Sequence, residues 1–166
     1  PQAFNWGAWG GPKETTERAP TYTEERTMTY LGIVHGAQGV VYFAWKYAMK
    51  EPSLGNALLD QLGPEIRALI PELLGGEPIE TRVTYVGDGG DLHILALRRG
   101  EHHTVIAVNP SHEDTEGSIT IPGLGDSPLA VVSESRTVPS SGGVIRDRFA
   151  PYTTHVYVTQ AARKPE

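Results

Sequence analysis

RAPTYTEERTMTYLGIVHGAQGVVYFAW, residues 18–45, decides how the first half of this chain folds. Thr21 and Glu24 have the spacing of a helix capping box, and apolar residues then recur three and four positions apart. We therefore predict a helix over roughly 22–35, with Gly36 as its stop signal. The run Val40–Trp45 is continuously β-branched and aromatic, which is typical of a parallel strand buried on both faces.

The segment that follows predicts further helix. Ser53 can cap a helix that starts near residue 54, and the pair Gly63-Pro64 interrupts it. An apolar stripe at helical spacing then covers 66–74. Pro71 lies inside this stripe, so the helix is expected to kink or restart there before it ends at Gly75-Gly76.

From residue 77 onward the pattern changes to short strands and turns. Seven runs rich in Val, Ile, Leu, Tyr or Thr are separated by turn residues, at 82–86, 92–97, 104–108, 118–121, 129–132, 144–148 and 155–158. This spacing favours an antiparallel β-sandwich. The predicted fold class is α+β, with a boundary between a segment 1–76 and a β-sandwich domain 77–166.

Composition excludes several classes of function. The chain has 166 residues, 39% of them hydrophobic, which is enough to bury a core. Its net charge of -6, without a Lys/Arg run, argues against nucleic-acid binding. It has no cysteine, no apolar run near the ~20 residues of a membrane span, and no signal-peptide pattern at its start. We expect a soluble protein without membrane or cofactor partners; its compartment stays open.

Residues 18–45 also carry a resemblance to a known family. The segment RAPTYTEER and the turn HGAQG at 35–39 are similar to the corresponding parts of bacterial (β/α)8-barrel glycoside hydrolases. The resemblance implies that 1–76 is the last part of such a barrel and that 77–166 is the β-sandwich that often follows it. It further implies a C-terminal fragment of a secreted or periplasmic parent, whose first six barrel strands are missing here.

The resemblance also implies where sugar would bind. In the family the eighth strand ends in an aromatic residue that faces the sugar cleft, and Trp45 holds that position. An indole stacks well on the apolar face of a sugar ring, although Trp45 is also suited to packing against the β domain. Gln2, Asn5, Trp6 and Lys46 would share the rim. Gln2 matches the family's nucleophilic Glu, and an amide cannot serve as that nucleophile, so no residue is assigned a catalytic role.

Other polar residues favour structural roles. Glu24 and Glu25 are interpreted as first-turn helix residues, Arg26 as the partner of a nearby carboxylate, and His35 as a hydrogen-bonded packing residue. His102-His103 point to opposite faces of a strand, and the acidic turn 112–114 offers too few oxygens for Ca²⁺. The sequence therefore predicts no metal site.

Three functions remain open at this stage. The leading one is a glycoside-hydrolase fragment that is inactive alone, because its catalytic carboxylates lie on missing strands. The second is a carbohydrate-binding module that uses Trp45, and the third is a structural accessory domain. Unpaired barrel surface predicts a homodimer.

Overall fold

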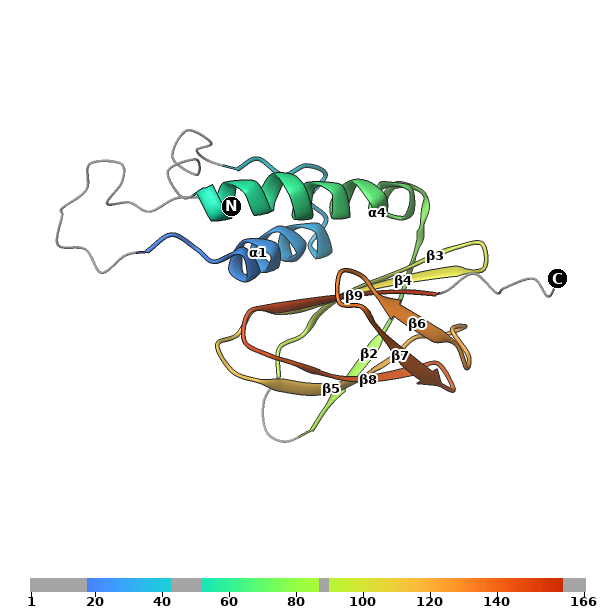
Figure 1. Ribbon diagram of the computed structural model, residues 1–166. Helices are drawn as coiled ribbons and strands as arrows, with labels where there is room; N and C mark the ends of the chain where they lie inside the picture. The colour runs from blue at the N-terminus through green and yellow to red at the C-terminus, as the bar shows by residue number, and fades with distance from the viewer. Residues whose placement is uncertain (1–17, 43–51, 87–89, 160–166) are drawn as a thin grey trace. The chain divides into compact units, whose positions relative to one another are not determined.

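The computed structural model describes residues 18–42, 52–86 and 90–159. The chain forms two compact units, Pro1–Ala68 and Leu69–Glu166, with helices in the first and a sheet in the second (Figure 1). The predicted combination of helices followed by antiparallel strands is confirmed at this level. None of the described helices is long and apolar enough to cross a membrane.

The predicted first helix is confirmed as α1 (Tyr22–Val34). Its capping box is complete, because the Thr21 hydroxyl accepts from the Glu24 N–H at 3.2 Å and the Glu24 carboxylate accepts from the Thr21 N–H at 2.8 Å. Arg18 donates two bonds of 2.6 Å to the same carboxylate. These bonds, chiefly those from Arg18, lower the pKa of Glu24 to about 2. Gly36, at φ 87°, then takes a left-handed conformation that favours glycine.

Three helical pieces follow: α3 (Pro52–Ala57), the π-helical turn η2 (Leu58–Leu62) and α4 (Gly63–Gly75). The break predicted at Gly63-Pro64 is present as the junction between η2 and α4. The restart predicted at Pro71 is wrong, because α4 runs through it as one helix. Both Pro71 and Arg67, whose carbonyl loses its helical donor, are exposed, so water can replace the missing hydrogen bond.

The predicted buried strand over 40–45 is wrong in its described part. Residues 40–42 form no strand, and Val41 is 82% exposed. The remaining residues, 43–45, lie outside the described part of the chain. A parallel strand needs flanking strands to pair its backbone groups, and the described part of the first unit offers none.

The second unit contains a nine-stranded sheet in its described residues, in the order β1-β3-β4-β9-β6-β7-β8-β5-β2. Every neighbouring pair is antiparallel. The strands are β1 (Glu77–Ile79), β2 (Arg82–Tyr85), β3 (His93–Arg99), β4 (His102–Asn109), β5 (Thr115–Thr120), β6 (Pro128–Val131), β7 (Arg136–Ser141), β8 (Val144–Phe149) and β9 (Thr153–Thr159). The seven predicted strands are all present, and β1 and β7 are additional.

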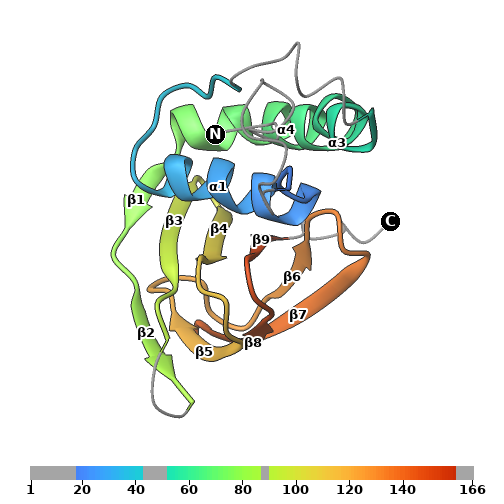
Figure 2. The same cartoon turned by 90° about the vertical axis from the view of Figure 1, so that its left-hand side faces the viewer.

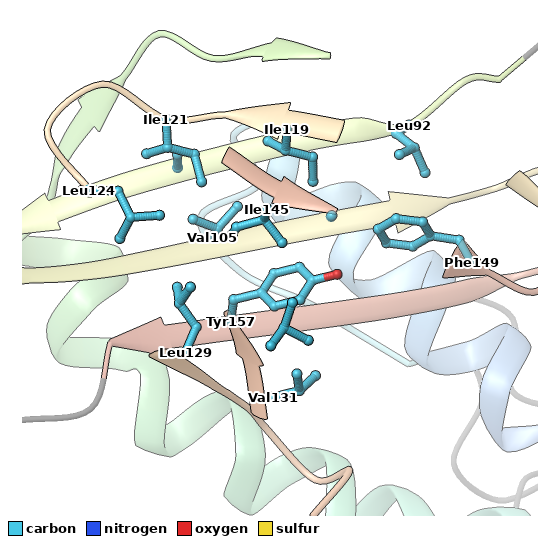
Figure 3. Close-up of a cluster of buried hydrophobic side chains, with 13 residues drawn as sticks. Leu92, Val105, Ile119, Ile121, Leu124, Leu129, Val131, Ile145, Phe149 and Tyr157 are labelled. Atoms are coloured by element: carbon cyan, nitrogen blue, oxygen red, sulfur yellow. The ribbon is translucent and has the colours of Figure 1, made fainter. Parts of the chain in front are cut away.

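The sheet curls around its own core because β7 changes partner along its length. Residues 136–139 of β7 pair with β6, whereas Ser140 and Ser141 pair with β8. Figure 3 shows the result: side chains from strands on both sides of β7, among them Val105, Ile145 and Tyr157, meet in one cluster. In β2, β5 and β8 the more buried residues alternate with more exposed ones, as a half-buried antiparallel sheet requires, whereas most residues of β4 and β9 are buried.

Candidate functional site

The five residues predicted to contact sugar lie outside the described part of the chain. They are Gln2, Asn5, Trp6, Trp45 and Lys46. The sugar rim therefore stays a prediction. The polar groups that the structure does describe gather in two places, one in each unit.

In the first unit, the Glu65 carboxylate at the start of α4 binds two side chains of α1, which lies beside it in Figure 2. Its Oε1 accepts from Arg26 Nη2 at 2.8 Å and from the Tyr30 hydroxyl at 2.5 Å. The predicted pairing of Arg26 with a carboxylate is confirmed. Both charges are largely buried, with side-chain exposures of 11% and 3%. We call these three residues the Glu65 cluster.

The electrostatics of the Glu65 cluster indicate a structural role in packing α1 against the start of α4. Burial raises the pKa of Tyr30, and the hydrogen bond to Glu65 raises it further, so the hydroxyl stays protonated and donates. The Arg26 guanidinium also lies 5.1 Å from the centre of the Tyr30 ring. Tyr22 lies one helical turn before Arg26, and its pKa is raised by burial and by the negative charge of Glu65. The Glu65 carboxylate is thus neutralised and saturated rather than poised for chemistry.

Glu25 is the exceptional residue of α1. It is 0% exposed, and neither carboxylate oxygen has a hydrogen-bond partner among the described residues. Burial raises its pKa to about 7. One turn later on the same side, the Thr29 hydroxyl lies 2.8 Å from the hydroxyl of Tyr42. A carboxyl group that holds its proton near neutrality has the chemistry of a general acid. Glycoside hydrolysis needs a second carboxyl group, and the described Glu65 is already taken by Arg26.

Sequence reasoning treated Glu25 as an ordinary first-turn residue, and its burial was missed. A signal was present: Glu25, Thr29 and Ile33 follow one another at spacing four, and all three are buried. A glutamate at the head of such a row points toward the packed side of the helix. The neighbouring Glu24 serves the cap, as predicted.

The buried carboxyl of Glu25 predicts a pH dependence for the first unit. Its folded pKa of about 7 lies above the ordinary 4.5, so its contribution to stability is complete below pH 4.5 and is lost as pH rises through 7. We expect the unfolding free energy of this unit to fall by about 1–3 kcal/mol over that range. The variant Glu25→Gln should lack this fall. Urea titrations followed by tryptophan fluorescence at several pH values measure it, because all three tryptophans precede residue 46.

Glu24→Gln is the matched control, because the pKa of Glu24 is lowered to about 2. That carboxylate stabilises the fold above pH 4.5 and loses its effect as pH falls toward 2. The two variants should therefore change the pH profile at opposite ends. Identical profiles for Glu25→Gln and the unmodified chain would contradict the role assigned to Glu25.

In the second unit, five side chains form a network beneath the β6–β7 turn. Arg136 binds Glu134 at 2.7 Å through Nε and Asp147 at 2.7 Å through Nη2. Tyr157 donates to Asp147 at 2.8 Å, and His155 Nδ1 lies 2.5 Å from Glu134. The other ring nitrogen of His155 faces a backbone oxygen of β8 at 3.2 Å. Both ring nitrogens thus face oxygen atoms of neighbouring groups.

The carboxylates of this network find their hydrogen-bond donors within the network itself. Burial alone would raise the pKa of Glu134, but the bonds from His155 and Arg136 outweigh it and hold the pKa below its ordinary value. The pKa of Asp147 is likewise lowered against burial, by Arg136 and Tyr157. Because each carboxylate already has cationic or hydroxyl donors, the network offers no open ligands for a metal. No group of three or more metal-ligating side chains exists among the described residues.

The remaining histidines have separate surroundings. His35 is the C-cap of α1 and is exposed, so the buried packing predicted for this hydrogen-bonded histidine is wrong. The ring of His103 is buried, which lowers its pKa, and its Nε2 has no hydrogen-bond partner within the described ranges. His102 is exposed on the same strand, as the alternation of faces predicts. His112, in the acidic turn, is exposed with Glu113 at 3.8 Å.

The fold is similar to that of parts of several solved glycoside hydrolases. No protein-family model and no curated protein matches the sequence. The structure is similar to that of an α-amylase from Geobacillus thermoleovorans complexed with acarbose, with a TM-score of 0.58 and 17% identity over 86% of this chain and 34% of that one. It is also similar to the noncanonic maltogenic α-amylase AmyB from Thermotoga neapolitana, with a TM-score of 0.56 and 14% identity over 84% of this chain and 37% of that one.

A third similar structure is a GH27 β-L-arabinopyranosidase from Geobacillus stearothermophilus in complex with arabinose. Its TM-score is 0.58 at 14% identity, over 90% of this chain and 33% of that one. At these identities the similarity concerns the fold. The chain thus spans about a third of the length of these three glycoside hydrolases.

Proposed function

We propose that this chain is the C-terminal part of a (β/α)8-barrel glycoside hydrolase. In this proposal residues 1–76 supply the last barrel elements, and residues 77–166 form an accessory β-sandwich domain. The observation that carries it is the structural similarity, which covers 84% to 90% of this chain but about a third of each hydrolase. The motif in residues 18–39 supports the same assignment independently.

The described polar groups support a non-catalytic role for the chain by itself. Glycosidases need two carboxyl groups placed on either side of the scissile bond. Here Glu65, Glu134 and Asp147 are each neutralised by an arginine. The catalytic carboxylates of the proposed enzyme therefore lie on the barrel strands that precede this chain, and the second unit braces the barrel.

The proposed contribution to the sugar cleft comes from Trp45, with Gln2, Asn5, Trp6 and Lys46 on the same rim. Two of the similar hydrolases were solved with acarbose or arabinose bound, which supports a carbohydrate as the ligand. An indole ring offers both the apolar face that stacks on a sugar and an N–H for its hydroxyls. A carbohydrate-binding module without hydrolysis would use the same residue, and the hydrolytic activity of the longer parent protein, rather than of this chain, separates the two proposals.

A homodimer of the isolated chain is also proposed. Two large apolar side chains of the first unit, Val41 and Leu59, are 82% and 56% exposed. Apolar side chains exposed to this extent favour association. Light scattering at increasing concentration tests it, and a monomer at all concentrations would contradict it.

The test of the proposed function uses two readouts on the same chain. A panel of chromogenic glycosides should give no turnover, whereas acarbose or arabinose should quench tryptophan fluorescence. Trp45→Phe should remove most of the quenching, and Trp9→Phe, the matched control, should retain it. Robust turnover by the chain alone would overturn the fragment proposal. Quenching that persists in Trp45→Phe would overturn the assignment of the sugar contact.

A further inference from the structure

The outward face of strands β2, β5 and β8 carries a polar pattern that the fold does not use. These strands are hydrogen-bonded neighbours (Figure 1), and their apolar residues, such as Val83, Ile119 and Ile145, point into the core. The alternate residues point outward. We call them, together with the neighbouring Ser141 of β7, the outer face: Arg82, Thr84, Glu116, Ser118, Thr120, Ser141, Val144, Arg146 and Arg148.

The strand register places hydroxyl groups directly beside guanidinium groups on the outer face. Thr84 pairs with Ser118, and Ser118 pairs with Arg146, which makes one row across three strands. In the next row Arg82 pairs with Thr120. Residues opposite one another on the same face of a sheet are within side-chain reach. Arg82 and Arg146 therefore each have a hydroxyl-bearing neighbour in their own row.

Two outer-face arginines that stand at the ends of these rows, Arg82 and Arg146, are unpaired in the described part of the chain. Within the described part of the chain, Arg82 and Arg146 have no hydrogen bond and no ion pair, whereas Arg26 and Arg136 bind carboxylates closely. Arg148 differs, because it lies 3.9 Å from Asp114 and opposite Glu116. Two free guanidinium groups on one face are notable in a chain with a net charge of -6.

Arg146 also lines a groove of about 320 Å³ together with Pro139, Ser141 and Val144. From the usual strand separation and rise, the Cα atoms of Arg82 and Arg146 are about 12 Å apart. The outer face thus presents a hollow, two separated positive charges and hydroxyl groups between them. This arrangement suits an extended ligand with spaced negative charges rather than a single small anion.

We propose that the outer face binds an acidic polysaccharide, a sugar chain that bears carboxylate groups. A guanidinium binds a carboxylate through two parallel hydrogen bonds, and the adjacent Thr and Ser hydroxyls match sugar hydroxyls. The negative character of the ligand rests on this face alone, whereas the carbohydrate class rests on the proposed function. Nucleic acid fits less well, because the face has no aromatic side chain for base stacking and the chain as a whole is acidic.

The experiment is calorimetric titration of the whole chain with oligogalacturonate at low salt. The fully methyl-esterified oligomer is the matched ligand, because it keeps the sugar chain and loses the charges. We expect binding of the acid form alone, weakening as salt is raised. Arg82→Gln and Arg146→Gln should each weaken binding about fivefold, and the double variant by more than about tenfold.

Arg67→Gln is the matched control variant, since it removes an exposed arginine from α4 and changes the net charge equally. It should bind like the unmodified chain, and far-UV circular dichroism should show all variants folded. Absence of binding, equal binding of the methyl ester, or equal weakening in Arg67→Gln would each overturn the proposal. Tighter binding of single-stranded DNA than of oligogalacturonate would overturn the carbohydrate assignment. Quenching of Trp45 by neutral sugars tests the first proposal separately, so the two failures are distinguishable.

Discussion

Replacement of Glu65 by alanine is expected to lower the unfolding free energy of the first unit by about 3–5 kcal/mol. The loss would leave the guanidinium of Arg26 largely buried without its counter-ion, and the Tyr30 hydroxyl without its acceptor. Such an uncompensated charge costs far more than the pair contributes when intact. Urea denaturation followed by tryptophan fluorescence measures the change, because Trp6, Trp9 and Trp45 all belong to this unit.

The control for this prediction is the double variant Glu65→Leu with Arg26→Met, which removes both charges and keeps the volume. It should recover most of the loss, because apolar replacement of a buried ion pair is often neutral. Tyr30→Phe added to it should recover a further part by removing the orphaned hydroxyl. A single Glu65→Ala variant within about 0.5 kcal/mol of the unmodified chain would show that the pair is solvated in solution.

Replacement of Asn109 by alanine is expected to destabilise the second unit by about 3–4 kcal/mol. The side chain is 0% exposed, and its Nδ2 donates to the backbone oxygens of Glu113 at 2.8 Å and Ala150 at 3.0 Å. Its Oδ1 accepts from the backbone N–H of Ser111 at 3.1 Å and from the Ser111 hydroxyl at 2.9 Å. One amide therefore holds the turn after β4 against the turn before β9, and its loss leaves several polar groups unpaired.

The matched control is Ser111→Ala, which removes one hydroxyl from the same turn and should cost about 1 kcal/mol. Chemical denaturation followed by far-UV circular dichroism compares the two variants. Equal losses for Asn109→Ala and Ser111→Ala would show that the amide acts only within its own turn. The result also bears on the acidic turn 112–114, because the Glu113 carbonyl accepts from Asn109 Nδ2 and from the Ser111 hydroxyl.

Local signals predicted those elements whose cause is local. The capping box at Thr21 and Glu24 marks the start of α1 without any tertiary information. Runs such as 104–108 predicted strands because buried positions demand β-branched residues. Strands β1 and β7 were missed for the opposite reason. Both contain proline, and β7 ends in two serines, so their strand character comes from pairing with β3, β6 and β8.

The wrong prediction of a buried strand at 40–42 also arises because strand pairing depends on neighbours that the local sequence does not specify. Continuous apolar character predicts burial between neighbours, but it does not supply them. Val41 is exposed because a lone extended segment has no sheet to join in the described part of its unit. The polar clusters were equally hidden: the Glu65 cluster joins residues 39 positions apart, and the partners of Glu134 are fixed by sheet register. The sequence correctly predicted a carboxylate partner for Arg26, but it did not show that this partner is Glu65.

The position of β9 bears on how the protein is made. This strand is last in sequence, yet it pairs on one side with β4 and on the other with β6. On a ribosome, β4 and β6 must emerge and wait with unpaired edges until residues 153–159 clear the exit tunnel. Completion of the sheet therefore waits for β9 and is paced by its longest chain closures, and this delay is when a chaperone would be most useful.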